Sequence, residues 1–274
     1  MLEAENVKFR YSHRQKYVLD GIGFSLKKGE IGVVLGKNGS GKTTLFKTIL
    51  GIEKPESGSI RFEGSDLQKI KKRERARIMA YVPQNIGLTG LTVFDTVLMG
   101  RMPYFGLKAS REDEKAVFKL LKDMGLQDLA TRNSDELSGG EKQKVIITRA
   151  LAQEPKLMIF DEPTGNLDIA NEQLILKEAV RLSKEKNISI LTSLHDLNQA
   201  LEIGDRFFLM KEGKIRYFGG PEIINEETIK DIYAADIRII ENDGKKIILN
   251  DIRMSEKSTA FFLMELSKES GRHM

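Results

Sequence analysis

The segment 36–44, which reads GKNGSGKTT, constrains the fold more than any other part of the 274-residue chain. It follows an apolar run, Ile31–Leu35, and precedes a stretch with helical periodicity at 45–50. A strand, a glycine-rich loop and a helix in this order form a phosphate-binding P-loop. The glycines let consecutive backbone N–H groups turn toward one anion, and the helix start adds the positive end of its dipole. The sequence therefore predicts a nucleotide phosphate site here.

Two side chains of this segment have expected roles in nucleotide binding. Lys42 is expected to reach the β- and γ-phosphates, and the hydroxyl of Thr43 to bind Mg²⁺. An ordinary glycine-rich turn is the alternative, but the full pattern arises by chance in only roughly 1% of chains of this length. The residues expected around the phosphates are Gly36, Asn38, Gly39, Ser40, Gly41, Lys42, Thr43 and Thr44.

Composition narrows the class of protein. Apolar residues make up 40% of the chain and charged residues 31%, which is typical of a soluble globular protein. The 44 basic and 40 acidic residues are too balanced to indicate nucleic-acid binding. The sequence has no cysteine, which excludes disulfides and cysteine metal sites. We find neither a signal peptide nor an apolar run of ~18 residues, so we expect any membrane role to depend on a partner.

The pattern of apolar residues predicts an α/β fold around the P-loop. Runs that suit a parallel core alternate with helical stretches, at 31–35, 78–82, 156–160, 188–191 and 206–210. An antiparallel sheet is expected from strands near 2–9, 18–26 and 58–64, with a change of phase at Glu5-Asn6. From about residue 88 to 152 the pattern is helical, with Ser110 as an N-cap and Asp113 three residues later. We therefore predict an antiparallel β subdomain, a parallel core and a helical insert.

The remaining elements are a basic helical stretch at 69–77, a long helix at 169–186, a short one at 196–203 and a hairpin about Glu212-Gly213. The tail is expected to hold a helix at 226–233, strands at 237–240 and 245–249, and an amphipathic segment at 259–266. The sequence does not indicate what this tail does.

Asp161 and Glu162 end an apolar run, at the edge of the sheet where ligands bind in open α/β folds. Because neighbouring residues of a strand point to opposite sides, we expect the two carboxylates to have different roles. Asp161 would join the Mg²⁺ shell, and Glu162 would orient and polarise the attacking water. A surface pair before a proline turn is the alternative.

Three further side chains become candidate site residues because the motifs above occur in the same chain. Gln84 follows a predicted strand and could reach the metal or the water through its amide oxygen. The alternative is an ordinary loop glutamine with no role in the site. His195 could hydrogen-bond a γ-phosphate, or serve a structural role. Tyr11 follows the first strand and could stack on a base, or be a sheet-edge aromatic.

The segment 137–143, LSGGEKQ, offers a second phosphate-binding device before a helix. Ser138, Gly139 and Gly140 supply a hydroxyl, free N–H groups and a positive dipole end. An ordinary helix N-cap is the alternative. Since one chain with one nucleotide hardly needs two such devices, we expect each chain to present this segment to the nucleotide of a second copy, in a head-to-tail two-fold dimer.

Taken together, over roughly residues 1–235, these motifs resemble the ATP-binding cassette family of transport ATPases. The P-loop, Gln84, the 137–143 signature, the acidic strand, the loop Asn166-Leu167-Asp168 and His195 follow the family's order and spacing. The resemblance implies a RecA-like P-loop NTPase core and ATP with Mg²⁺ as cofactors. It implies that Tyr11 stacks on adenine, that Glu162 is the catalytic base, and that Ser138 and Gly140 contact the partner's ATP. It also implies that Asp168 contacts nucleotide. Residues 236–274 become a C-terminal extension of unknown role.

The resemblance extends further to importers of iron-siderophore, haem, cobalamin and related chelates. It rests on the segments 99–104 (MGRMPY), 194–200 (LHDLNQA) and 217–221 (YFGGP). It implies a membrane permease as partner, a solute-binding protein acting indirectly, and a place on the cytoplasmic face of the membrane. A groove for the permease's coupling helix is expected at Val97, Leu98, Met99, Met102, Tyr104 and Phe105, with insert core as the alternative.

The chain departs from the family's pattern at a few positions. Glu141 stands where glutamine is most frequent, which we expect to leave the phosphate contacts of Ser138–Gly140 intact, and Lys142 and Lys144 stand where arginine is frequent. Gly165 before Asn166 also occurs in exporters, so that loop does not indicate a direction of transport. Three alternative functions remain. The first is another importer or an exporter. The second is a chromosome or DNA-repair ATPase, which would carry a coiled-coil insertion, and the third is a P-loop small-molecule kinase, which would lack the segment 137–143.

Overall fold

The computed structural model describes residues 1–84, 90–165, 167–242 and 244–250. The chain divides into two compact units, residues 1–223 and 224–274. Among the described helices, none is both long enough and apolar enough to cross a membrane.

A six-stranded sheet forms the centre of the first unit, in the order β10-β9-β3-β8-β7-β6. All neighbours are parallel except the edge pair of β9 and β10. Every residue of β3, β7 and β8 is buried, because helices and a second sheet cover both faces. The strands are β3 (Ile31–Leu35), β6 (Met79–Val82), β7 (Leu157–Asp161), β8 (Ser189–Ser193), β9 (Arg206–Lys211) and β10 (Lys214–Gly219). The predicted parallel core is confirmed.

A four-stranded antiparallel sheet, in the order β2-β1-β4-β5, precedes this core. Its strands are β1 (Leu2–Phe9), β2 (Leu19–Leu26), β4 (Ser57–Phe62) and β5 (Ser65–Asp66). The expected change of phase in β1 is a bulge between Ala4 and Val7, where Asn6 has a positive φ of 48°. The bulge keeps apolar side chains on the buried face on both sides of the irregularity.

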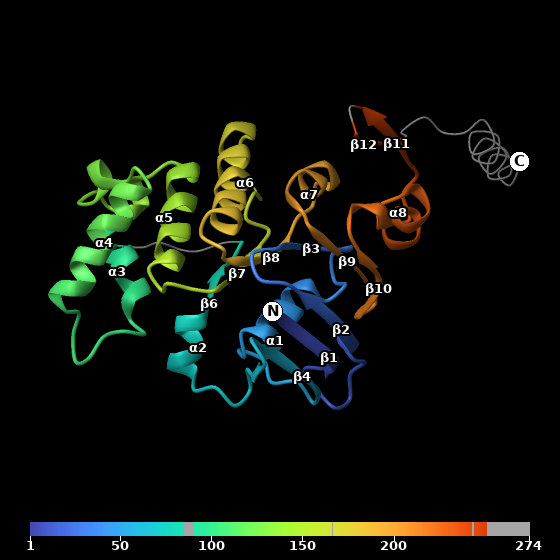
Figure 1. The fold of residues 1–274 in the computed structure, drawn as a ribbon, viewed down its shortest axis with the longest axis horizontal. Coiled ribbons are helices and arrows are strands. Elements are labelled where there is room, and N and C mark those ends of the chain that lie inside the picture. The colour runs from blue at the N-terminus through green and yellow to red at the C-terminus, as the bar shows by residue number, and fades with distance from the viewer. Residues whose placement is uncertain (85–89, 166, 243, 251–274) are drawn as a thin grey trace, which may run out of the picture. The chain divides into compact units, whose positions relative to one another are not determined.

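Helices lie on both faces of the central sheet. Helix α1 (Lys42–Ile49) lies on the same side as the antiparallel sheet, whereas α6 (Ile169–Lys184) and α7 (Leu197–Ile203) cover the other side (Figure 1). Leu45, Phe46 and Ile49 of α1 are fully buried in the core that joins the two sheets. This packing fixes the P-loop at the carboxyl end of β3.

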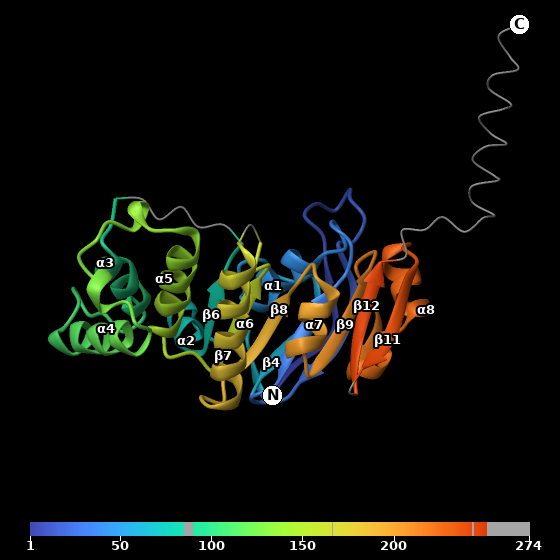
Figure 2. The same cartoon turned by 90° about the horizontal axis from the view of Figure 1, so that it is seen from above.

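The helical insert follows β6 along the chain. It contains α3 (Val93–Leu98), a 3-10 turn (Met99–Arg101), α4 (Arg111–Asp123) and α5 (Gly139–Leu151), and these helices lie together beyond β6 (Figure 2). Ser110 and Asp113 form the predicted cap of α4 as a complete capping box. The buried guanidinium of Arg101 pairs with Asp113 at 3.1 Å and with Glu154 at 2.6 Å, which ties the insert together. The helical insert is confirmed.

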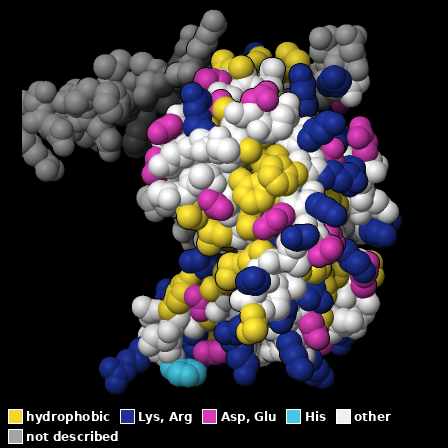
Figure 3. All heavy atoms as spheres, turned by 90° about the vertical axis from the view of Figure 1, so that its left-hand side faces the viewer, with side chains coloured by type: hydrophobic (Ala, Val, Ile, Leu, Met, Phe, Trp, Pro, Cys, Tyr) yellow, Lys and Arg dark blue, Asp and Glu magenta, His cyan; other side chains and the backbone are white. Residues whose placement is uncertain are grey.

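Helix α2 (Lys72–Ile78) is the basic helix expected before β6, and it includes Ile78, which the sequence assigned to the strand. The side of the first unit that carries α3 and α4 exposes apolar groups among lysines and arginines (Figure 3). The exposed large apolar residues of the insert are Leu91, Met99, Met102, Leu107 and Phe118.

The second unit contains α8 (Glu226–Tyr233) and an antiparallel pair, β11 (Ile237–Asn242) and β12 (Lys245–Asn250). Asn225 caps α8 in a capping box with Thr228. The carboxylate of Glu226 accepts a hydrogen bond from the backbone N–H of Ile239, which joins the helix to β11. The three predicted elements are present, and the amphipathic segment 259–266 lies outside the described residues.

Candidate nucleotide-binding and hydrolysis site

The P-loop leaves β3 at Gly36 and enters α1 at Lys42. Gly41 caps the helix with φ of 105°, and a Cβ there would lie 2.8 Å from the carbonyl oxygen of Val18. A Cβ at Gly36 would lie 2.5 Å from the carbonyl oxygen of Met210. Both positions therefore require glycine, as the predicted phosphate-binding turn does.

Lys42 is buried inside this loop. Its Nζ donates to the carbonyl oxygen of Gly36 at 2.9 Å and lies 3.9 Å from Oε1 of Glu162. Burial lowers the pKa of Lys42, and the nearby carboxylates of Glu162 and Asp161 oppose that shift. The loop thus holds a buried cation whose carboxylate partner, Glu162, lies 3.9 Å away, and such a cation favours a bound phosphate.

Two hydroxyl groups of the P-loop suit nucleotide and metal binding. The Oγ of Ser40 is buried and has no hydrogen-bond partner in the described part of the chain, and Thr43 is exposed at the start of α1. The described residues contain no cluster of three or more acidic, histidine or cysteine side chains that could hold a metal alone. Mg²⁺ usually binds through one or two protein groups together with phosphate oxygens, so Thr43 and Asp161 suit it.

Asp161 is the last residue of β7 and is buried. Its Oδ1 accepts a hydrogen bond from the hydroxyl of Ser193 at 2.8 Å, and its Oδ2 accepts one from the hydroxyl of Tyr81 at 3.3 Å. Burial, followed by the charge of Asp161, raises the pKa of Tyr81, so Tyr81 stays a donor at neutral pH. Two neighbouring strands thus fix the orientation of this carboxylate.

Glu162 takes a different direction from Asp161, but not for the predicted reason. It lies beyond the strand in a left-handed conformation, with φ of 53°, and its N–H donates to the hydroxyl of Ser193 at 3.0 Å. The separation of the carboxylates therefore comes from this backbone turn and not from strand alternation. A non-glycine residue held in this conformation is strained, and such strain is frequent at active sites.

His195 lies 2.8 Å from Glu162, measured from Nε2 to Oε2. The other carboxylate oxygen of Glu162 faces Lys42, so one side chain joins the P-loop to the histidine after β8. Gln84 lies beside the loop that follows Glu162: its Nε2 is 3.5 Å from the place where a Cβ on Gly165 would be. The structure thus brings Lys42, Glu162 and His195 into contact.

Tyr11 lies next to the start of α1. Its hydroxyl is 3.1 Å from Oγ1 of Thr44, and its ring meets Phe9 edge to face at 4.9 Å. The side chain is 55% exposed, so a face remains open to a planar ligand. The stacking role predicted for Tyr11 stays a prediction.

Ser138 is the N-cap of α5. Its hydroxyl donates to Oε2 of Glu141 at 2.7 Å, and its N–H donates to the same oxygen at 2.9 Å. These hydrogen bonds lower the pKa of Glu141 and keep it charged. Glu141 therefore occupies two of the groups that were expected to be free for a phosphate.

The first turn of α6 lies against the signature segment. A Cβ on Gly140 would lie 1.9 Å from Oδ1 of Asn171, so a larger residue there would displace the Asn171 side chain. Asn171 in turn donates to both carboxylate oxygens of Asp168, at 2.9 and 2.8 Å. Asp168 acts as the cap of α6, and its expected contact with nucleotide stays a prediction.

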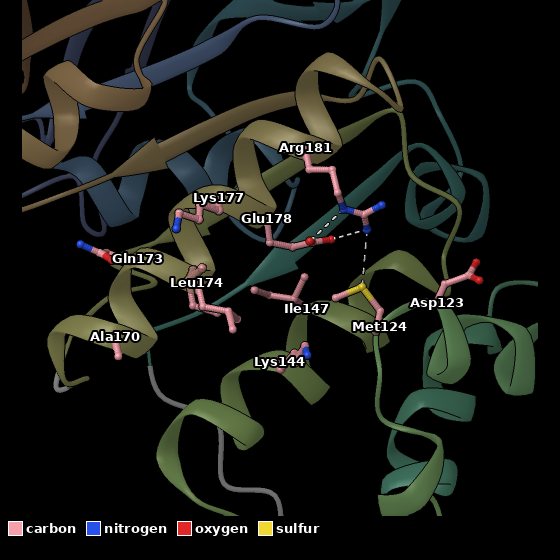
Figure 4. A pocket seen from close by; sticks show the side chains of 11 residues that line it. Asp123, Met124, Lys144, Ile147, Ala170, Gln173, Leu174, Lys177, Glu178 and Arg181 are labelled. Carbon is pink, nitrogen blue, oxygen red and sulfur yellow. Dashed lines mark hydrogen bonds and ion pairs between the residues drawn. The ribbon is translucent and has the colours of Figure 1, made fainter.

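The two phosphate-binding segments belong to separate parts of the first unit. Helix α5 packs on α3, β6 and α6, whereas α1 packs on β7, and β7 and α6 lie between α1 and α5 in both views (Figures 1 and 2). A cavity of about 460 Å³ between α5, α6 and the end of α4 contains none of the predicted site residues (Figure 4). There Arg181 pairs with Glu178 and donates to the sulfur of Met124.

Sequence reasoning missed Tyr81, Ser193 and Asn171. Each touches a predicted residue only because of the order of strands and helices, and none forms part of a recognised motif. Their position in the sequence could have indicated a role for two of them, because Tyr81 and Ser193 lie near the carboxyl ends of the strands that flank β7.

Comparisons with known proteins agree with this geometry. A family model described as ABC transporter matches residues 19–165. An uncharacterized ABC transporter ATP-binding protein of Methanocaldococcus jannaschii is 42% identical over 91% of this chain and 97% of its own length. A spermidine/putrescine import ATP-binding protein of Mesoplasma florum is 36% identical over 93% and 76%. A siderophore transport system ATP-binding protein of Bacillus subtilis is 35% identical over 82% and 83%.

Solved structures give the same result. A metal-chelate type ABC transporter in an inward-facing conformation superposes with a TM-score of 0.79, at 29% identity, over 91% of this chain and 96% of the other. A dimeric ATP-binding cassette bound to ADP and Pi superposes with a TM-score of 0.70, at 26% identity, over 80% and 98%. The chain belongs to the ABC transporter family, as an ATP-hydrolysing, ATP-binding subunit.

Proposed function

We propose that this subunit powers the import of a metal chelate, of the iron-siderophore, haem or cobalamin type, through a membrane permease. The observation that carries the proposal is the likeness to a metal-chelate type transporter over 91% of the chain. The siderophore-transport relative supports the same class. The chain would lie on the cytoplasmic face of the membrane, and a solute-binding protein would deliver the chelate from outside.

In the proposed mechanism, two copies enclose two ATP molecules in a head-to-tail dimer. Lys42 and the P-loop amides hold the phosphates, while Thr43, Asp161 and Gln84 would hold Mg²⁺, which neutralises phosphate charge when bound. Glu162 accepts a proton from the attacking water, and His195 holds the carboxylate of Glu162 in place. The dimeric cassette with ADP and Pi supports this assembly.

The second copy completes the site. Ser138, Gly139 and Gly140 would supply a hydroxyl and N–H groups to the ATP bound by the partner, which explains why these groups lie apart from the P-loop of their own chain. Closure of the dimer then assembles the site, and hydrolysis reopens it. We expect no nucleic-acid partner.

A polyamine importer is the second candidate, since the Mesoplasma florum relative matches 93% of the chain at 36% identity. The two candidates separate when the chain is reconstituted with its permease and solute-binding protein in liposomes. We expect an iron-siderophore, haem or cobalamin to stimulate ATP hydrolysis and to accumulate inside, and spermidine to do neither. Stimulation by spermidine alone would refute import of a chelate.

A further inference from the structure

The positive charge of this chain is concentrated in one short stretch. Segment 69–77 holds six basic residues and one acidic residue, which gives it a net charge of +5. The whole chain carries only +4, so the rest of the sequence is slightly acidic. Most of the stretch forms α2, which lies on the side of the central sheet opposite α6 (Figure 1). The charge is therefore a local feature of one face of the first unit.

The chain itself hardly neutralises this charge. Five of the six cations have exposed side chains, and they are Lys69, Lys71, Lys72, Arg73 and Arg77. Within the ranges that the structure describes, only Lys69 among them forms an ion pair, with Asp66 at 3.9 Å. Arg73 and Arg77 donate to backbone carbonyl oxygens instead. Clustered cations without carboxylate partners produce a positive potential, which attracts an anionic surface.

Residues 102–109, which we call the insert loop, are held against α2. The carbonyl oxygen of Pro103 accepts hydrogen bonds from Nε of Arg73 at 2.8 Å and from Nη2 of Arg77 at 2.9 Å. The carbonyl oxygen of Phe105 accepts a further one from Nη2 of Arg73. These hydrogen bonds place the insert loop beside the cations of α2, so the two segments present one continuous surface.

The insert loop adds apolar side chains to this charge. Leu107 is fully exposed and Met102 is 58% exposed, and Lys108 places a further exposed cation beside Leu107. Single exposed apolar residues are common, but apolar side chains next to a cluster of cations are the combination that interfacial membrane anchors use. Val97, which was expected to line a permease groove, is by contrast fully buried in the insert and cannot contact a partner.

We propose that this surface binds a membrane that contains anionic lipids. We call it the basic face; it comprises the exposed cations of segment 69–77 together with Lys108, Met102 and Leu107. Lipid phosphates would meet the lysines and arginines, and Leu107 would enter the zone between headgroups and acyl chains. Charge complementarity selects an anionic partner, and the exposed apolar side chains select a membrane over a nucleic acid, which offers phosphates but no apolar phase.

The inference goes beyond the proposed function, in which the permease alone brings the subunit to the membrane. It requires neither a permease nor a particular substrate, because the basic face belongs to this chain alone. A contact with lipid would add to the affinity of the chain for its place on the membrane. It would also make that affinity depend on the lipid composition and on the salt concentration.

The first test is cosedimentation of the purified chain with vesicles of phosphatidylcholine, with and without phosphatidylglycerol. We expect the parent chain to bind only the anionic vesicles, and binding to fall as potassium chloride is added, because salt screens exposed charges. Lys71→Gln combined with Lys108→Gln should weaken binding about twentyfold, at about fivefold for each charge removed.

The matched control is Lys177→Gln combined with Lys186→Gln. It removes the same charge from exposed positions in α6 and just after it, away from the basic face, and it should bind as the parent chain does. Melting temperature and basal ATP hydrolysis should be unchanged in both double variants. The described part of the chain gives none of these four lysine side chains a hydrogen bond or an ion pair, so no contact within the chain is lost.

The second test follows the apolar contact directly. The chain contains no tryptophan, so a single introduced one can report on its surroundings. On anionic vesicles the emission of the Leu107→Trp variant should shift to shorter wavelength and be quenched by brominated lipid, because the side chain enters the interfacial zone. Leu174→Trp, at a 41% exposed position of α6, should show neither change.

Several results would overturn the proposal. Equal losses of binding in the two double variants would show that only net charge matters, and equal binding to neutral vesicles would remove the role of anionic lipid. Unchanged emission of Leu107→Trp would remove the apolar contact. Release of the chain from vesicles by duplex DNA or RNA at equal phosphate concentration would assign the face to nucleic acid. If vesicle binding fails while the reconstituted transporter imports a chelate, this inference alone fails. If spermidine is imported while vesicle binding holds, the proposed function alone fails.

Discussion

Replacement of Ser193 by alanine tests how the two catalytic-site carboxylates are held. The Ser193 hydroxyl is fully buried, donates to Asp161 at 2.8 Å and accepts from the N–H of Glu162 at 3.0 Å. Loss of one charge-assisted and one neutral hydrogen bond should cost about 2–4 kcal/mol of unfolding free energy. In a unit of this size the melting temperature should fall by roughly 5–10 °C. ATP hydrolysis should fall at least about tenfold even where the chain is fully folded, because both carboxylates lose their orientation.

Ser189→Ala is the matched control. Ser189 lies on the same strand, is equally buried and also makes two hydrogen bonds, from the N–H of Gly29 at 3.2 Å and to the carbonyl oxygen of Lys27 at 3.3 Å. Neither partner is a carboxylate, so Ser189→Ala should lower the melting temperature and leave turnover per folded molecule unchanged. Calorimetry and a steady-state phosphate-release assay at 25 °C measure both quantities. Equal effects of the two variants on turnover would refute the orienting role of Ser193.

Three further predictions concern charged groups of the site. Glu162→Gln should abolish turnover while ATP binding persists, so an ATP-bound dimer should accumulate and be seen by size-exclusion chromatography. Hydrolysis near the parent rate would contradict the role of Glu162 as base. Lys42→Ala should weaken binding of an unhydrolysable ATP analogue at least about tenfold in a titration, because the buried cation is removed; unchanged affinity would contradict it. Hydrogen bonds from Ser138 lower the pKa of Glu141, so its stabilising effect is present above about pH 4.5 and is lost as the pH falls through the lowered value. The difference in urea midpoint between the parent and Glu141→Ala should therefore shrink below about pH 4; a constant difference would show that the charge is not involved.

Much of the fold could be predicted from the sequence because the pattern of apolar residues in each segment agrees with the burial of that segment in the fold. The apolar runs of β3, β7 and β8 are buried on both faces, so their composition alone identifies them as strands of a covered parallel sheet. The change of phase noted at Glu5-Asn6 likewise coincides with the bulge of β1. Each of these features depends on residues close together in the sequence.

The parts of the site that escaped prediction depend on backbone conformation and on strand order. The left-handed turn at Glu162 could not be inferred, because glutamate rarely adopts it without support from its surroundings. The hydrogen bond from Tyr81 to Asp161 joins residues 80 positions apart, and it exists only because β6 pairs with β7. The burial of Val97 depends on how α3 packs on α4 and α5.

The signature segment, residues 137–143, precedes a helix as predicted, but the hydrogen bonds of Ser138 differ from the prediction. Sequence reasoning treated Glu141 as neutral toward the phosphate contacts of Ser138, but the Glu141 carboxylate accepts both the hydroxyl and the N–H of Ser138. An anion that approached Ser138 would meet this carboxylate, and the hydroxyl would have to turn away from it. On the other side, the Asn171 side chain lies where a Cβ on Gly140 would be, and it is held by Asp168 of the same chain. The signature segment thus makes these contacts within its own chain, and in the proposed dimer both the hydroxyl and the N–H of Ser138 would have to exchange the Glu141 carboxylate for the phosphate of a second chain's ATP.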